Sequence, residues 1–85
     1  MQSFSNRLIA LRKERGLTQA ELAKATHLQR STLSGYETEG KEPTFETLCA
    51  LAAYFNVTTD YLLGISSART HNDAVFSAYT PEMRA

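Results

Sequence analysis

The side chains best suited to recognition lie together at residues 29–34, in the run QRSTLS. One is an arginine and four are uncharged hydrogen-bonding residues: Arg30, Gln29, Ser31, Thr32 and Ser34. A helix face that only meets solvent usually carries Glu and Lys pairs, because these residues favour the helix. This run instead uses side chains that hydrogen-bond well to base edges and phosphates. The pattern therefore indicates a helix whose exposed face binds nucleic acid.

Two short helices joined by a tight turn must position this run. Thr18 is followed three residues later by Glu21, the spacing of a capping box that marks a helix start. The turn falls near His27, and a second periodic run follows it. The apolar residues that would face inward are Leu17, Leu22, Ala23, Leu28, Leu33 and Tyr36. The stretch from residue 17 to residue 37 thus reads as a helix, a turn and a helix.

Composition bounds the remaining possibilities. A chain of 85 residues with 42% hydrophobic residues has room for one small domain. Its single cysteine, Cys49, excludes an internal disulfide and leaves too few thiols for a zinc site. His27 and His71 have no catalytic partner at a telling spacing, so we expect no enzyme, metal or cofactor. Neither a membrane span nor a signal peptide is visible, and we expect a cytoplasmic protein without membrane contact.

The formal net charge of zero hides an asymmetry along the chain. Residues 1–35 carry six basic and two acidic side chains, whereas residues 36–85 carry three basic and seven acidic ones. This division predicts a modestly basic face near the two helices and an acidic remainder. A modest basic face implies modest non-specific affinity for DNA.

The sequence resembles the Cro and phage-repressor type of helix-turn-helix domain over about three quarters of its length. Several separated motifs agree with that family in order and spacing: GLTQ at 16–19, ELA at 21–23, RSTLS at 30–34, Glu37, the Gly40-Lys41 pair, Pro43 and FNVTTDYLLG at 55–64. Two positions depart from the pattern. His27 stands where the family usually has a turn glycine, and Gly35 stands where it commonly has a long polar side chain. One expected base or phosphate contact is therefore missing at Gly35.

The resemblance implies an all-α, five-helix domain of the lambda-repressor type that binds a double-stranded DNA operator as a transcriptional regulator, typically a repressor. The second helix of the motif, around residues 29–37, would read the major groove. The implied DNA-binding residues are Thr18, Gln19, Gln29, Arg30, Ser31, Thr32, Ser34 and Lys41. Arg12 and Glu37 would form a structural ion pair. Regulators of this type usually bind as homodimers, because one recognition helix reads too few base pairs.

Five short helices are expected over residues 3–64. The first begins near Ser3 or Ser5 and ends near Arg15, and the fourth covers residues 44–55 with Cys49 beside its inner stripe. The expected inward residues of these two helices are Phe4, Leu8, Leu11, Phe45, Leu48, Leu51, Ala52 and Phe55. A last helix is capped by Thr58 or Thr59 and stops at Gly64, with Val57, Tyr61 and Leu62 closing the core.

We expect the helix-turn-helix domain to occupy residues 1–65 and a tail to occupy residues 66–85. In the tail, Val75, Phe76 and Tyr79 could share one face of a short helix used for docking or oligomerisation. A second function stays open: the same fold serves as a protein-interaction module in antitoxin and anti-repressor complexes, and a protein antagonist is then a further partner. The zero net charge and Gly35 favour that alternative, whereas Gln19, Arg30 and Ser31 favour DNA.

Overall fold

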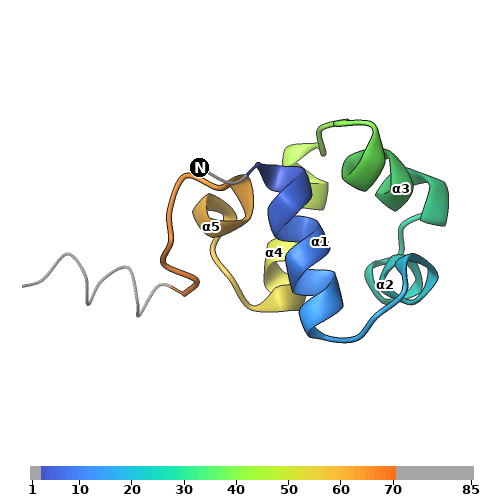
Figure 1. Cartoon of the computed structure of the whole chain (residues 1–85), viewed down its shortest axis with the longest axis horizontal. Helices are drawn as coiled ribbons and strands as arrows, with labels where there is room; N and C mark the ends of the chain where they lie inside the picture. Colours follow the sequence, from blue (N-terminus) through green and yellow to red (C-terminus); the bar gives the residue numbers. More distant parts are fainter. Residues whose placement is uncertain (1–2, 71–85) are drawn as a thin grey trace, which may run out of the picture.

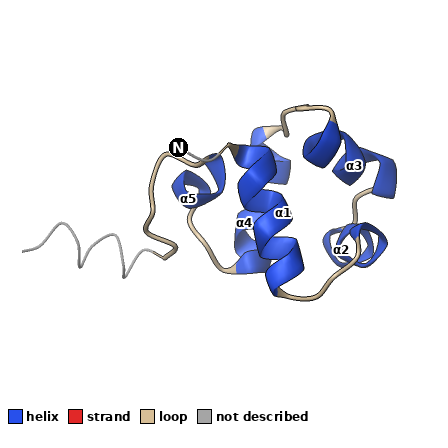
Figure 2. Ribbon diagram, in the orientation of Figure 1, coloured by secondary structure: helices blue, strands red, loops and turns tan. Residues whose placement is uncertain are grey.

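The computed structural model describes residues 3–70 of the chain, and these residues form five helices without any strand (Figure 1, Figure 2). The helices are α1 (Phe4–Glu14), α2 (Gln19–Thr26), α3 (Arg30–Thr38), α4 (Phe45–Phe55) and α5 (Thr59–Leu63). The prediction of an all-α fold with five helices is confirmed. Within the described part of the chain, no helix is long and apolar enough to cross a membrane.

Local signals in the sequence fix most helix ends. Four helices begin after a residue whose hydroxyl accepts a hydrogen bond from a first-turn backbone N–H: Ser3, Thr18, Thr44 and Thr58. Three helices end at a residue in the left-handed region: His27 (φ 58°), Asn56 (φ 56°) and Gly64 (φ 84°). His27 thus adopts the turn conformation expected of it, at the steric cost that glycine would avoid.

Each helix contributes one leucine with no exposed surface to a common core: Leu8, Leu22, Leu33, Leu51 and Leu62. Burying one such side chain stabilises the fold by roughly 1.5–3 kcal/mol. Figure 1 shows α1 crossing α4, with α5 on one side and the α2–α3 pair on the other. Helix α1 packs against both α3 and α5, and α2 packs against α3 and α4. The orientation of α3 is therefore set by α1 and α2.

Two expectations for α4 are wrong. Phe45 is 88% exposed, although its spacing places it on the apolar stripe with Leu48 and Leu51. It is the first residue of α4, and Leu48, one turn later, is the first buried residue of the stripe. Cys49 is also exposed and not near-core, because it follows Leu48 by one residue and so lies about 100° around the helix from it.

The chain stays in contact with the domain beyond Ile65. The backbone N–H of Thr58 donates to the carbonyl of Arg69 at 2.6 Å, and the Arg69 guanidinium binds both carboxylate oxygens of Glu14 at 2.8 and 2.9 Å. Hydrogen bonds from Arg69 hold the pKa of Glu14 below its usual value. Ala68 and Arg69 therefore contact α1 and the start of α5. The division into a domain over residues 1–65 and a tail over residues 66–85 stays a prediction. Val75, Phe76 and Tyr79 lie outside the described residues, so their role stays a prediction.

The exposure of Cys49 can be tested by alkylation. We expect the thiol in the folded protein to react with iodoacetamide at nearly the rate seen in concentrated urea at the same pH, because no packing shields it. Mass spectrometry of the adduct over time gives both rates. A folded-state rate slower by orders of magnitude would place Cys49 in the core.

Candidate nucleic-acid interface

Helix α3 has one buried and one exposed face. Leu33, Tyr36 and Glu37 are buried against the rest of the domain. The residues of the polar run lie on the other side: Gln29, Arg30 and Ser31 are exposed, and Thr32 and Ser34 are half-buried. The helical period thus separates the side chains that hold α3 from those predicted to bind DNA.

The exposed face has few partners of its own. Gln29 precedes α3 without capping it by a side-chain hydrogen bond, and Ser31 makes only a long contact of 3.5 Å with the Gln29 amide oxygen. Arg30 forms no hydrogen bond or ion pair with any residue in the range 3–70. The polar groups at the start of α3 are therefore available to an external ligand.

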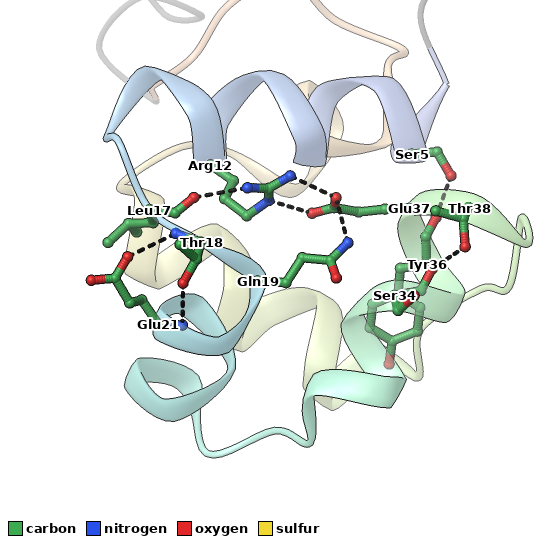
Figure 3. A network of polar contacts seen from close by, with 10 residues as sticks. All are labelled: Ser5, Arg12, Leu17, Thr18, Gln19, Glu21, Ser34, Tyr36, Glu37 and Thr38. Atoms are coloured by element: carbon green, nitrogen blue, oxygen red, sulfur yellow. Dashed lines mark hydrogen bonds and ion pairs between the residues drawn. The ribbon is translucent and has the colours of Figure 1, made fainter.

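The buried face is held by a network centred on Glu37 (Figure 3). Arg12 donates to the two carboxylate oxygens of Glu37 at 2.7 and 2.9 Å, and also to the carbonyl oxygen of Leu17 at 2.8 Å. Glu37 is only 9% exposed, so its charge is almost removed from water. The hydrogen bond to Glu37 raises the pKa of Arg12. The structure thus forms the ion pair that the resemblance implies, and it joins α1 to α3.

Gln19 adds a contact that the sequence analysis did not foresee. Its amide nitrogen donates to Glu37 at 3.0 Å, so the first residue of α2 is tied to the same carboxylate. One amide hydrogen remains for a second acceptor. Gln19 therefore has a structural role in addition to the predicted phosphate contact, and only the buried carboxylate at position 37 could have suggested it.

Thr18 begins α2 with a complete capping box. Its hydroxyl accepts from the backbone N–H of Glu21 at 3.1 Å, while the Glu21 carboxylate accepts from the backbone N–H of Thr18 at 2.8 Å. The second bond lowers the pKa of Glu21. The predicted capping box is confirmed, and it fixes the first turn of α2 beside α3.

The cations of residues 1–35 do not all contribute to a basic face. Arg12 is neutralised by Glu37, the Arg7 guanidinium lies 4.0 Å from the centre of the Tyr61 ring, and Arg15 donates to the carbonyl oxygens of Tyr54 and Phe55. Three of the six cations thus have partners within the domain, but only Arg12 is paired with a carboxylate, and Arg15 remains exposed. The charge available near α3 is smaller than the sequence division suggests.

Two further positions, Lys41 and Gly35, concern the predicted DNA-binding surface. Lys41 is exposed in the loop after α3, with its ammonium 3.4 Å from a Glu39 carboxylate oxygen. Gly35 follows exposed Ser31 by four residues and so lies on the same side of α3, where the side chain of Lys41 covers it. The expectation that a base or phosphate contact is missing at Gly35 stays a prediction. Residues 3–70 contain no cluster of His, Cys, Asp or Glu that could hold a metal ion.

The Glu37 network predicts a large effect of one substitution. Glu37→Ala leaves the guanidinium of Arg12, which is largely shielded from water, without its carboxylate, and we expect the free energy of unfolding to fall by about 3 kcal/mol. Urea denaturation monitored by circular dichroism measures this change in the free energy of unfolding. Glu14→Ala, which removes the exposed partner of Arg69, is the matched control and should cost much less. Equal losses for the two variants would contradict this account of the network.

Comparison with known proteins agrees with this geometry. A family model described as helix-turn-helix matches residues 8–62. The chain is 37% identical over 71 residues to the HTH-type transcriptional regulator ImmR of Bacillus subtilis, a match that covers 84% of this chain and 56% of that protein. It is 38% identical over 62 residues to the immunity repressor protein of Bacillus phage phi105, covering 73% of this chain and 43% of that one. The chain therefore spans only about half the length of these relatives.

Solved structures show the same fold. The crystal structure of the P22 c2 repressor protein in complex with a synthetic operator superposes with a TM-score of 0.71 at 32% identity, covering 78% of this chain and 100% of that one. A transcriptional regulator from Listeria innocua gives a TM-score of 0.69 at 25% identity, covering 96% of this chain and 82% of that one. This chain accordingly belongs to the helix-turn-helix family, of the Cro and phage-repressor type that its motifs resemble.

Proposed function

We propose that this domain binds double-stranded DNA sequence-specifically and regulates transcription, with α3 in the major groove. The observation that carries the proposal is the separation of faces on α3: one face is fixed by the Glu37 network, and the other presents unpaired hydrogen-bonding side chains. The names of the relatives, which are transcriptional regulators and a phage repressor, support it. Repression is the mode that we propose.

The position of each side chain on the motif suggests its role. Arg30 and Ser31 lie in the first turn of α3, where side chains of a recognition helix reach base edges. The guanidinium fork of Arg30 matches the two acceptors of guanine, so we assign a G to it. Gln29, Thr32 and Ser34 flank this pair. Thr18, Gln19 and the N–H groups at the start of α2 face backbone phosphates in this arrangement.

The domain acts as a homodimer in this proposal, because two half-sites are needed for selectivity. The large exposed hydrophobic residues among residues 3–70 are Phe45, Leu63 and Ile65. Phe45 and Leu63 border a cleft of about 220 Å³ that Phe4, Pro43 and Leu48 also line. An exposed Phe45 ring beside this cleft suits a twofold contact between two copies of the domain. In that contact the Phe45 ring of each copy enters the cleft of the other copy. The occupant of the cleft is thus a second copy.

The alternative function is binding of a protein partner or antagonist through the same fold. The pairing of Arg12 with Glu37 favours it, since one cation fewer remains for phosphates. Affinity for genomic DNA fragments at two salt concentrations separates the two functions. A DNA-binding domain loses affinity steeply as salt rises, whereas a protein-interaction module shows no measurable DNA affinity at low salt.

Selection of binding sites from a random DNA pool tests the role of Arg30. Arg30→Ala should weaken binding to the preferred operator by about 1–3 kcal/mol and relax the choice of base at one position in each half-site. Gln19→Ala should weaken binding to all DNA sequences about equally, since a phosphate contact does not depend on the identity of the base. If the Arg30→Ala variant enriches the same DNA motif as the wild type and binds it with unaltered affinity, then Arg30 on the exposed face of α3 does not read a base.

The dimer contact is tested by sedimentation over a range of concentrations. Phe45→Ser should shift the equilibrium towards monomer, because it removes the ring that fills the cleft. Cys49→Ser, an exposed change one turn further along α4, is the control and should leave the equilibrium unchanged. Truncation after Thr70 keeps Arg69 in place and removes Val75, Phe76 and Tyr79. Loss of the dimer on truncation, with Phe45→Ser unchanged, would assign the contact to the tail.

A further inference from the structure

Gly35 lies inside α3 although its backbone does not require glycine. Its φ is not among the positive values of the chain, and glycine is the poorest helix former after proline. Gly35 lies on the same side of α3 as exposed Ser31, yet it has little exposed surface because Lys41 covers it. Its occupancy by glycine therefore calls for a packing reason.

The packing reason is the side chain of Lys41. A Cβ atom added at Gly35 would lie 3.0 Å from Cδ of Lys41 and 3.7 Å from both Cγ and Cε. The first distance is shorter than ordinary van der Waals contact. An alanine at position 35 would therefore require the methylene stem of Lys41 to shift by a few tenths of an ångström, and a longer side chain would displace the stem further.

The backbone brings Lys41 to this place. The carbonyl oxygen of Gly35 accepts from the N–H groups of Glu39 at 3.0 Å and of Lys41 at 3.2 Å, so the loop folds back onto α3. Gly40, at φ 68°, provides the reversal between them. Both the main chain and the side chain of Lys41 consequently rest on Gly35.

The ion pair with Glu39 does not explain this arrangement. The Lys41 and Glu39 side chains are both more than half exposed, and their charged atoms are 3.4 Å apart. Exposed pairs of this kind constrain a lysine weakly, because water screens the attraction and both side chains lose rotamer freedom. The contact of the Lys41 stem with Gly35 is a second constraint on where the ammonium lies.

We propose that Gly35 is a positioning residue for Lys41: the missing side chain leaves a seat in which the lysine stem is held, so that its ammonium is placed beside α3 before DNA arrives. The inference rests on the proposed DNA-binding function, in which Lys41 contacts a backbone phosphate. A seated stem has already lost part of the rotamer freedom that phosphate binding would otherwise remove. Gly35 acts on DNA through Lys41 and carries no base information itself.

The seat can be tested in the free protein by nuclear Overhauser spectroscopy. We expect cross-peaks between the Hα protons of Gly35 and the δ and ε methylene protons of Lys41. The same methylene protons should lose contact with the backbone of residue 35 in Gly35→Met, whose unbranched side chain fills the seat and can donate no hydrogen bond to DNA. Absence of the wild-type cross-peaks would overturn the proposal whether or not the protein binds DNA.

A double-mutant cycle tests the consequence for binding, with the selected operator as probe. Gly35→Met should weaken affinity by between about twofold and tenfold when Lys41 is present, and should have no effect in the Lys41→Ala background. Gly35→Ala should act in the same direction by less. Circular dichroism checks that each variant is folded, which we expect because both new residues are better helix formers than glycine. An equal loss with and without Lys41 would show that position 35 acts independently of the lysine.

Should the wild-type protein bind no DNA at low salt, the proposed function fails while the cross-peaks still decide whether the seat exists. The two failures are therefore distinguishable.

Discussion

The carboxylate of Glu37 is the constraint on which the rest of the domain depends. A charge so far removed from water is tolerable only when its oxygens are paired, and here Arg12 and Gln19 pair them. The partners come from α1 and α2, so a single side chain of α3 is fixed against two other helices (Figure 3). The hydroxyl of Ser5 donates to the carbonyl of Tyr36 and joins α1 to α3 a second time. The five buried leucines hold the helices together in one core, and the Glu37 network fixes the orientation of α3 relative to α1 and α2.

This arrangement shapes the recognition chemistry. Because Arg12 is paired with Glu37 and Arg30 is the one cation of α3, the exposed face of α3 relies on hydrogen-bonding groups more than on total charge. On such a surface, contacts with bases contribute more to DNA affinity than general electrostatic attraction to phosphates does. The few remaining cations then matter individually, which is why the placement of Lys41 has a consequence that one lysine among many would not have.

The parts of the structure that the sequence predicted are those set by local chemistry. The capping box of Thr18 depends on residues three positions apart, so spacing alone reveals it, whereas the left-handed turn at His27 is implied by the resemblance, in which a glycine usually stands there. Phe45 fits the helical period of the buried residues of α4 but is exposed, and no local pattern shows which positions other helices cover. The contacts of Gln19 with Glu37 and of Lys41 with Gly35 join residues brought together by turns of the chain. The resemblance located the recognition helix, but only the folded structure shows which residues of the neighbouring helices fix it in place.

The central claim is that DNA meets the exposed face of α3 and the start of α2. Titration of isotopically labelled protein with an operator duplex, followed through backbone amide chemical shifts, tests it most directly. The account predicts that the largest shifts occur in residues 29–34 and at Thr18, Gln19 and Lys41, while amides of α5 and of the second half of α4 change little. Shifts centred on α4 and α5, or no shifts in low salt, would contradict the assignment of this face to DNA.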